Sequence, residues 1–168
     1  MIKPLFERVL VAHNGSQPAV WASKYGILMA HRYGCTLKAV YVVDTATLKR
    51  LTISKYFVQD EFADYEKNLT EDGKRFLNYV TDLGKQKKVR VQTELRQGAV
   101  LPEIIASAVE MNANLILLGG YADDRIVAKN TLAERHSVEF FNQEIIANAP
   151  CSVLVVREKM IDQLFKLA

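Results

Sequence analysis

The chain has 168 residues, of which 49% are hydrophobic and 24% are charged, and it carries a formal net charge of +3. This size and composition fit one globular domain over residues 1–168 with a core of its own. The small net charge, and a basic run at 85–88 without interleaved aromatic residues, argue against a nucleic-acid partner.

The cysteines, the histidines and the lack of targeting signals exclude further kinds of site and location. Two cysteines without a Cys-x-x-Cys pair and three dispersed histidines give no metal-ligand spacing. No apolar run approaches the ~20 residues needed to span a bilayer, and the N-terminus lacks a signal-peptide pattern. We therefore expect a cytoplasmic protein with no metal and no membrane partner.

Five short apolar runs are predicted to form the strands of a parallel sheet. The run at 36–43 is apolar on both alternating faces, which is typical of a strand covered on both sides. The expected strands are residues 8–13, 36–43, 89–93 (near the sheet edge), 115–118 and 152–156.

Amphipathic segments between these runs predict helices. Ser16 is expected to cap the first helix, which should end at Gly34 in a left-handed conformation. Further helices are expected at 62–84, from Pro102 to about 111, and from a Ser137 cap to 148, whereas 44–57 has no clean period. Alternation of strand and helix predicts right-handed crossovers with helices on both faces of the sheet.

The C-terminal tail at 158–168 places apolar residues on one helical stripe. They are Ile161, Leu164, Phe165 and Ala168. The stripe either packs against its own domain or covers a dimer partner, because an exposed apolar stripe needs a cover.

Four segments, taken in order, resemble the universal stress protein family. They are the apolar strand with Asn-Gly-Ser at 8–16, the glycine and helix start at 98–105, the strand at 114–119, and Ala-Pro-Cys-Ser with its strand at 149–156. The resemblance implies an α/β, three-layer, flavodoxin-like or Rossmann-like domain. It implies a five-stranded parallel sheet of order 3-2-1-4-5, commonly in a homodimer.

The resemblance also implies a nucleotide site at the carboxyl edge of the sheet, where open α/β folds place their clefts. The candidate residues are His13, Asn14, Gly15, Ser16, Val42, Val43, Gly98, Gly119 and Gly120. Each has a plainer alternative. Asn14 can form an ordinary Asx turn, His13 can be a satisfied polar group, and the valines and later glycines can serve the core and the backbone.

ATP-binding members carry Gly-x2-Gly-x9-Gly-Ser/Thr, in which bare peptide N–H groups approach the phosphates. Counting from Gly119 or Gly120, the second glycine falls on Ala122 or Asp123. Counting back from the Ala-Pro before the last strand, the final pair falls on Glu139 and Phe140, at the expected entrance of the last helix. A carboxylate there would disfavour an anion, so we expect the triphosphate grip to be absent.

The segment 121–136 offers cations that could replace the lost glycines. They are Arg125, Lys129, Arg135 and His136. The alternative is a solvated loop in which nearby carboxylates balance these charges.

No P-loop, Gly-x-Ser-x-Gly or Gly-x-Gly-x-x-Gly motif occurs, so we expect no enzyme activity. The leading interpretation is a non-catalytic stress-type protein without a cofactor. It would act through a homodimer formed at the edge of the fifth strand and through an unidentified protein partner. The alternative is a sensor that binds ATP or AMP by an altered loop.

Overall fold

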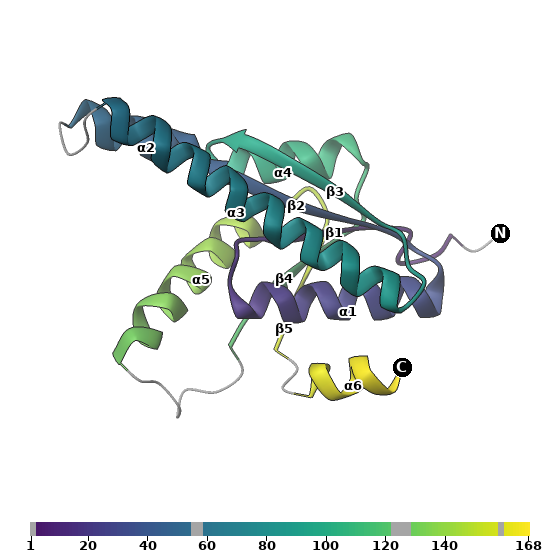
Figure 1. The fold of residues 1–168 in the computed structure, drawn as a ribbon. Coiled ribbons are helices and arrows are strands. Elements are labelled where there is room, and N and C mark those ends of the chain that lie inside the picture. Colours follow the sequence, from purple (N-terminus) through teal and green to yellow (C-terminus); the bar gives the residue numbers. More distant parts are fainter. Residues whose placement is uncertain (1–2, 55–58, 122–128, 158–159) are drawn as a thin grey trace.

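Five parallel strands form one sheet in the order β3-β2-β1-β4-β5 (Figure 1). The computed structural model describes residues 3–54, 59–121, 129–157 and 160–168. The strands are β1 (Arg8–His13), β2 (Thr36–Asp44), β3 (Val91–Gly98), β4 (Leu115–Gly119) and β5 (Ser152–Val156). The helices are α1 (Gln17–Tyr33), α2 (Thr45–Ile53), α3 (Gln59–Gln86), α4 (Val100–Glu110), α5 (Lys129–Asn148) and α6 (Ile161–Leu167). The predicted α/β class and strand order are confirmed.

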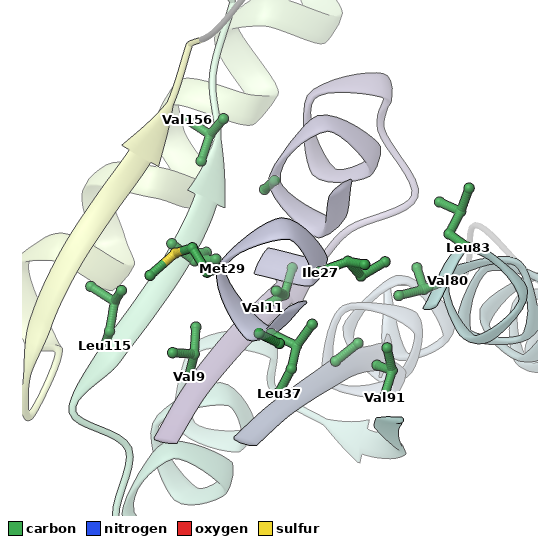
Figure 2. Packing of buried hydrophobic residues seen from close by; sticks show 14 of the residues in the cluster. Val9, Val11, Ile27, Met29, Leu37, Val80, Leu83, Val91, Leu115 and Val156 are labelled. Atoms are coloured by element: carbon green, nitrogen blue, oxygen red, sulfur yellow. The ribbon is translucent and has the colours of Figure 1, made fainter. Parts of the chain in front are cut away.

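Hydrophobic side chains fill both faces of the sheet, which gives three layers. Val9 and Val11 of β1 point toward α1, α3 and α6, and Figure 2 shows this cluster. Leu10 and Ala12 point the other way, toward α4 and α5. Because successive strand residues face opposite sides, a run that is apolar at every position is what two covered faces require.

The first helix begins and ends as its sequence predicts. Ser16 Oγ accepts a hydrogen bond from the Ala19 backbone N–H at 3.3 Å, which caps the N-terminus of α1. Gly34 follows the last turn with φ of 69°, and its N–H donates to the Ala30 carbonyl. Both signals are local, so neighbouring sequence was sufficient to predict them.

Two elements differ from expectation. β3 begins at Val91 rather than Val89, because the Val89 N–H donates to the Gly84 carbonyl in the turn after α3. The strand then continues to Gly98, five residues beyond the expected end at 93. The unassigned region after β2 forms α2, which Asp44 caps by accepting from the Thr47 N–H at 2.9 Å.

Gly73 lies inside α3, on the side that faces the sheet. A Cβ at this position would lie 2.7 Å from side-chain atoms of Tyr41 and Leu95. The missing side chain therefore lets α3 pack closely against β2 and β3, and the helix continues to Gln86.

A polar network attaches α4 to the sheet. Arg96 of β3 donates to Glu103 at 2.7 Å and to Glu94 at 2.7 Å, and Glu94 also accepts from Ser107 of α4 at 2.6 Å and from Lys38. Burial alone would raise the pKa of Glu94. The hydrogen bonds from Lys38, Ser107 and Arg96 outweigh burial and lower this pKa to about 2.

The C-terminal tail packs against its own chain as α6. Ile161 is fully buried and Phe165 is 4% exposed, whereas Leu164 of the same stripe remains 47% exposed. The buried side of the tail therefore packs against its own domain, which is the first of the two alternatives that the sequence left open.

Candidate functional site

The carboxyl ends of β1, β2 and β4 meet at one edge of the sheet (Figure 1). β1 pairs with β2 on one side and with β4 on the other. The chain therefore builds the sheet in one direction from β1 to β3 and in the opposite direction from β4 to β5. Ligands bind at such a change of direction in open α/β sheets, so the predicted site residues converge on the expected region.

The turn after β1 is held by its own side chains. Asn14 Oδ1 accepts from the Ser16 N–H at 3.1 Å and from the Ser16 hydroxyl at 2.5 Å. Gly15 has a φ of 80°, a backbone conformation that residues with a Cβ atom rarely adopt. Asn14, Gly15 and Ser16 thus form an Asx turn that leads into α1.

His13 is buried beneath this turn with only 2% of its surface exposed. Its Nδ1 accepts from the Gly15 N–H at 3.0 Å, so the proton of the neutral ring lies on Nε2. Within the described residues, Nε2 has no hydrogen-bond partner. Burial lowers the pKa of His13 to about 4, so the ring is neutral at physiological pH.

An aromatic stack begins at His13. Phe76 of α3 stacks on the imidazole with 5.5 Å between centroids, and Tyr41 of β2 stacks on Phe76 at 5.9 Å. No local signal in the sequence indicated the contact of Phe76 with His13, 63 positions earlier. The stack fills the space between the turn after β1 and α3.

The end of β4 is tightly enclosed. A Cβ on Gly119 would lie 1.9 Å from the Pro18 carbonyl oxygen, so only glycine fits against α1. The Gly119 carbonyl accepts from Asn142 Nδ2 of α5 at 2.8 Å, and the Gly120 N–H donates to the Val156 carbonyl at 3.0 Å. Sequence reasoning missed the buried Asn142, because a polar residue inside a helix carries no sign of its tertiary partner.

The ends of β2 and β3 lie side by side. Asp44 is paired in register with Gly98, and the side chains of Val42 and Val43 are buried in the core. Gly98 has φ of 142°, and a Cβ there would lie 3.1 Å from the Glu103 side chain. The side chains of the two valines therefore belong to the core, and Gly98 lies where the backbone adopts a positive φ.

A cleft of about 380 Å³ opens directly beyond these strand ends. It is lined from α2, from the first turn of α4 and from α5. Lining residues include Asp44, Thr47, Arg50, Ala99, Pro102, Ser137, Phe140 and Glu144. Its size falls within the range of small-molecule sites.

The cleft combines polar groups with an aromatic ring. Arg50 donates to the Thr47 hydroxyl at 3.3 Å, and Phe140 is 67% exposed. Ala99 is the N-cap residue of α4 and has no side chain that can accept a hydrogen bond, so the first N–H groups of that helix lack a side-chain cap from this residue. Sequence analysis missed Arg50, because 44–57 has no readable period. Of the predicted site residues, none lines this cleft, although Val43 and Gly98 directly precede residues that do.

The expected start of the last helix is wrong. α5 begins at Lys129, so Glu139 lies in its interior, ten residues after the first, and does not occupy the helix entrance. Ser137 is likewise inside the helix and caps nothing. Residues 129–136 include Leu, Ala, Glu and Arg, which are strong helix formers, and the helix extends through them.

The cation cluster proposed for this segment is largely outside the described side chains. Arg125 lies outside the described residues, and for Lys129 and Arg135 the backbone alone is described as helical. His136 is exposed on α5. Among the described residues, no three metal-ligating side chains lie together, and no helix is long and apolar enough to cross a membrane.

Both the sequence and the fold of this chain match those of known proteins. The model of the universal stress protein family matches residues 5–157. The chain belongs to the universal stress protein family. One relative from Staphylococcus saprophyticus is 30% identical over 166 residues, covering 96% of this chain and 89% of the relative. A universal stress protein of Methanocaldococcus jannaschii is 26% identical over 154 residues, covering 92% of this chain and 84% of that protein.

Solved universal stress proteins share the architecture. A family member from Burkholderia pseudomallei superposes with a TM-score of 0.64 at 23% identity, covering 94% of this chain and all of that one. A universal stress protein in complex with cAMP gives a TM-score of 0.54 at 15% identity, covering 90% of this chain and 97% of that chain. The Archaeoglobus fulgidus protein in complex with dAMP gives 0.58 at 15% identity, covering 92% of this chain and all of that one.

Proposed function

We propose that this universal stress protein is non-catalytic and acts by self-association through the open edge of β5 and by contact with a protein partner. The observation that carries this proposal is the apolar edge strand. β5 pairs only with β4 among the described strands, and Leu154 is 37% exposed on it. An unprotected apolar edge is a template for pairing with another chain.

The region of the family's phosphate site supports a role without the usual triphosphate grip. Neither register of the Gly-x2-Gly-x9-Gly-Ser/Thr pattern occurs after β4. Asn14 Oδ1 is engaged by Ser16, and the Gly119 carbonyl is engaged by Asn142. These two oxygen atoms accept hydrogen bonds from groups inside the protein.

A charge at the edge strand tests self-association. Leu154→Lys should yield a monomer in light scattering at micromolar concentration, whereas wild-type protein should have the mass of a dimer. Ile53→Lys is the matched control, because Ile53 is 82% exposed on α2 and should leave the dimer intact. Monomeric wild-type protein would contradict the proposal.

A second candidate function is nucleotide sensing with ATP or AMP, or a related adenine nucleotide, as ligand. The cleft at the ends of β2 and β3 favours it, because Arg50, the uncapped start of α4 and the exposed Phe140 ring meet there. Arginine suits a phosphate and an aromatic ring suits a base. The solved relatives in complex with cAMP and dAMP add support.

Thermal unfolding with ATP, ADP, AMP and cAMP, each with and without magnesium, separates the two functions. A nucleotide at 100 times its dissociation constant stabilises the native state by about 2.7 kcal/mol, which raises Tm by several degrees. Arg50→Glu should abolish that shift, whereas Lys49→Glu, at the exposed neighbouring position outside the cleft, should preserve it. No shift with any nucleotide would leave partner contact as the function.

A further inference from the structure

The turn after β1 contains the single Asn-Gly pair of the chain, Asn14 and Gly15. In such a pair the backbone nitrogen of the glycine can attack the side-chain Cγ of the asparagine, because the attack closes a five-membered ring. Glycine suits this step, since it has no Cβ atom to hinder the approach. The structure places this pair between a base and two hydrogen-bond donors.

His13 is the base beside the attacking nitrogen. Its Nδ1 accepts a hydrogen bond from the Gly15 N–H at 3.0 Å, and this is the proton that must leave when the nitrogen attacks. Burial lowers the pKa of His13 to about 4, so the ring is neutral at physiological pH and the Nδ1 lone pair can take the proton. A base within hydrogen-bond reach of the transferred proton meets the geometric requirement of general-base catalysis.

Two donors from Ser16 lie on the group that is attacked. The Asn14 Oδ1 accepts from the Ser16 N–H at 3.1 Å and from the Ser16 hydroxyl at 2.5 Å. This oxygen gains negative charge when the Gly15 nitrogen adds to Cγ, and donors already in place stabilise that charge as it forms. Asn14 is half-buried, so water reaches its side chain for the later hydrolysis.

From this arrangement, we propose that Asn14 is a self-modification site, at which the native fold promotes deamidation of the asparagine to aspartate. The Gly15 nitrogen forms a bond to Asn14 Cγ, and its proton passes to His13 Nδ1. Because burial disfavours the imidazolium, His13 gives the proton on to the side-chain nitrogen, which leaves as ammonia, and a succinimide remains. One water molecule then opens the ring at Cγ. The net change converts asparagine and water into aspartate and ammonium, with no other reactant.

The fold also selects between the two products of ring opening. Opening at the backbone carbonyl would give isoaspartate, which lengthens the main chain between β1 and α1. Gly15 lies against the Phe76 ring, where even a Cβ would be only 2.9 Å away, so a longer main chain does not fit. Aspartate keeps both hydrogen bonds from Ser16 and places a negative charge beside the N-terminus of α1, which favours it. The modification therefore adds a charge at the carboxyl edge of the sheet and preserves the turn.

Peptide mapping by mass spectrometry, during incubation of the full chain at neutral pH, tests the proposal. Asn14 should convert at least about tenfold faster in the native protein than in the same protein denatured in guanidinium chloride, because unfolding separates the base and the donors from the reacting atoms. Asn112 is an internal control. It is exposed, but the N–H of Ala113 donates to the Ala108 carbonyl and not to a base, so Asn112 should stay intact. Conversion of Asn14 that is no faster in the native protein would overturn the proposal.

Three variants test the roles of the neighbouring groups. His13→Phe removes the base and keeps a ring against Phe76, so native conversion should slow at least about tenfold. Ser16→Ala removes the hydroxyl donor and should also slow it. Ser23→Ala is the matched control on the same helix, because the Ser23 hydroxyl donates to the Ala19 carbonyl and should leave the rate unchanged. Undiminished conversion in both His13→Phe and Ser16→Ala would overturn the assigned chemistry.

The identity of the product is a separate readout. The modified peptide should co-elute with the same peptide from Asn14→Asp, and the modified protein should unfold at the Tm of that variant. A modified peptide that consists mainly of isoaspartate would contradict the preserved turn.

Discussion

At the scale of single residues, His13 is a buried polar group of the candidate site that is held on two sides. Its Nδ1 is fixed by the Gly15 N–H, and Phe76 covers its ring. Protonation would place a charge where 2% of the side chain is exposed. The neutral form is therefore the form that the fold accepts.

This burial predicts a loss of stability in acid. The folded-state pKa of about 4 lies below the ordinary value of 6.5, so the unfolded chain binds a proton first. The contribution of His13 is complete above pH 6.5 and is lost as the pH falls toward 4. From about pH 7.5 to about pH 4.5, this residue should cost about 2.5 kcal/mol of unfolding free energy.

Urea unfolding at several pH values measures this effect. His13→Phe keeps an aromatic partner for Phe76 and cannot titrate, so its stability should fall less over the same range. The difference between the two pH profiles isolates His13 from the carboxylates, which titrate in both proteins. Parallel profiles would show that burial does not hold the imidazole neutral.

At the scale of elements, the contact between β4 and α1 depends on a missing side chain. Gly119→Ala would place a Cβ 1.9 Å from the Pro18 carbonyl oxygen, a backbone atom that cannot rotate away. We expect a loss of about 3 kcal/mol, at the upper end of overpacking costs. Gly34→Ala is the control, because a Cβ there meets nothing within 4 Å and strains only the backbone at φ of 69°. It should cost about 1 kcal/mol. Equal losses in thermal unfolding would contradict the steric account.

Elements differ in how far sequence alone could predict them. Five strands, their order and the caps of α1 follow from apolar runs, from the family resemblance and from local turn chemistry. The start of α5 could not be predicted in this way. Ser137 is a good cap residue in isolation, but the helix-forming residues before it extend the helix. The contacts of Gly119 with Asn142 and of His13 with Phe76 join distant positions, and no local pattern encodes them.

At the scale of the whole molecule, self-association would make stability depend on protein concentration. If a dimer unfolds to two separate chains, each tenfold increase in concentration stabilises it by about 1.4 kcal/mol. Wild-type Tm should therefore rise across a concentration series, and the Tm of Leu154→Lys should stay constant. A constant wild-type Tm would contradict the proposed dimer.

The two borders of the sheet have different chemistry, and this difference would limit any assembly. β3 lies at the border opposite β5 and presents the charged Glu94 and Arg96, which discourage strand pairing. Two chains joined at β5 would leave β3 at both outer ends of one continuous sheet. Growth would then stop after a single step, giving a closed pair and no fibre.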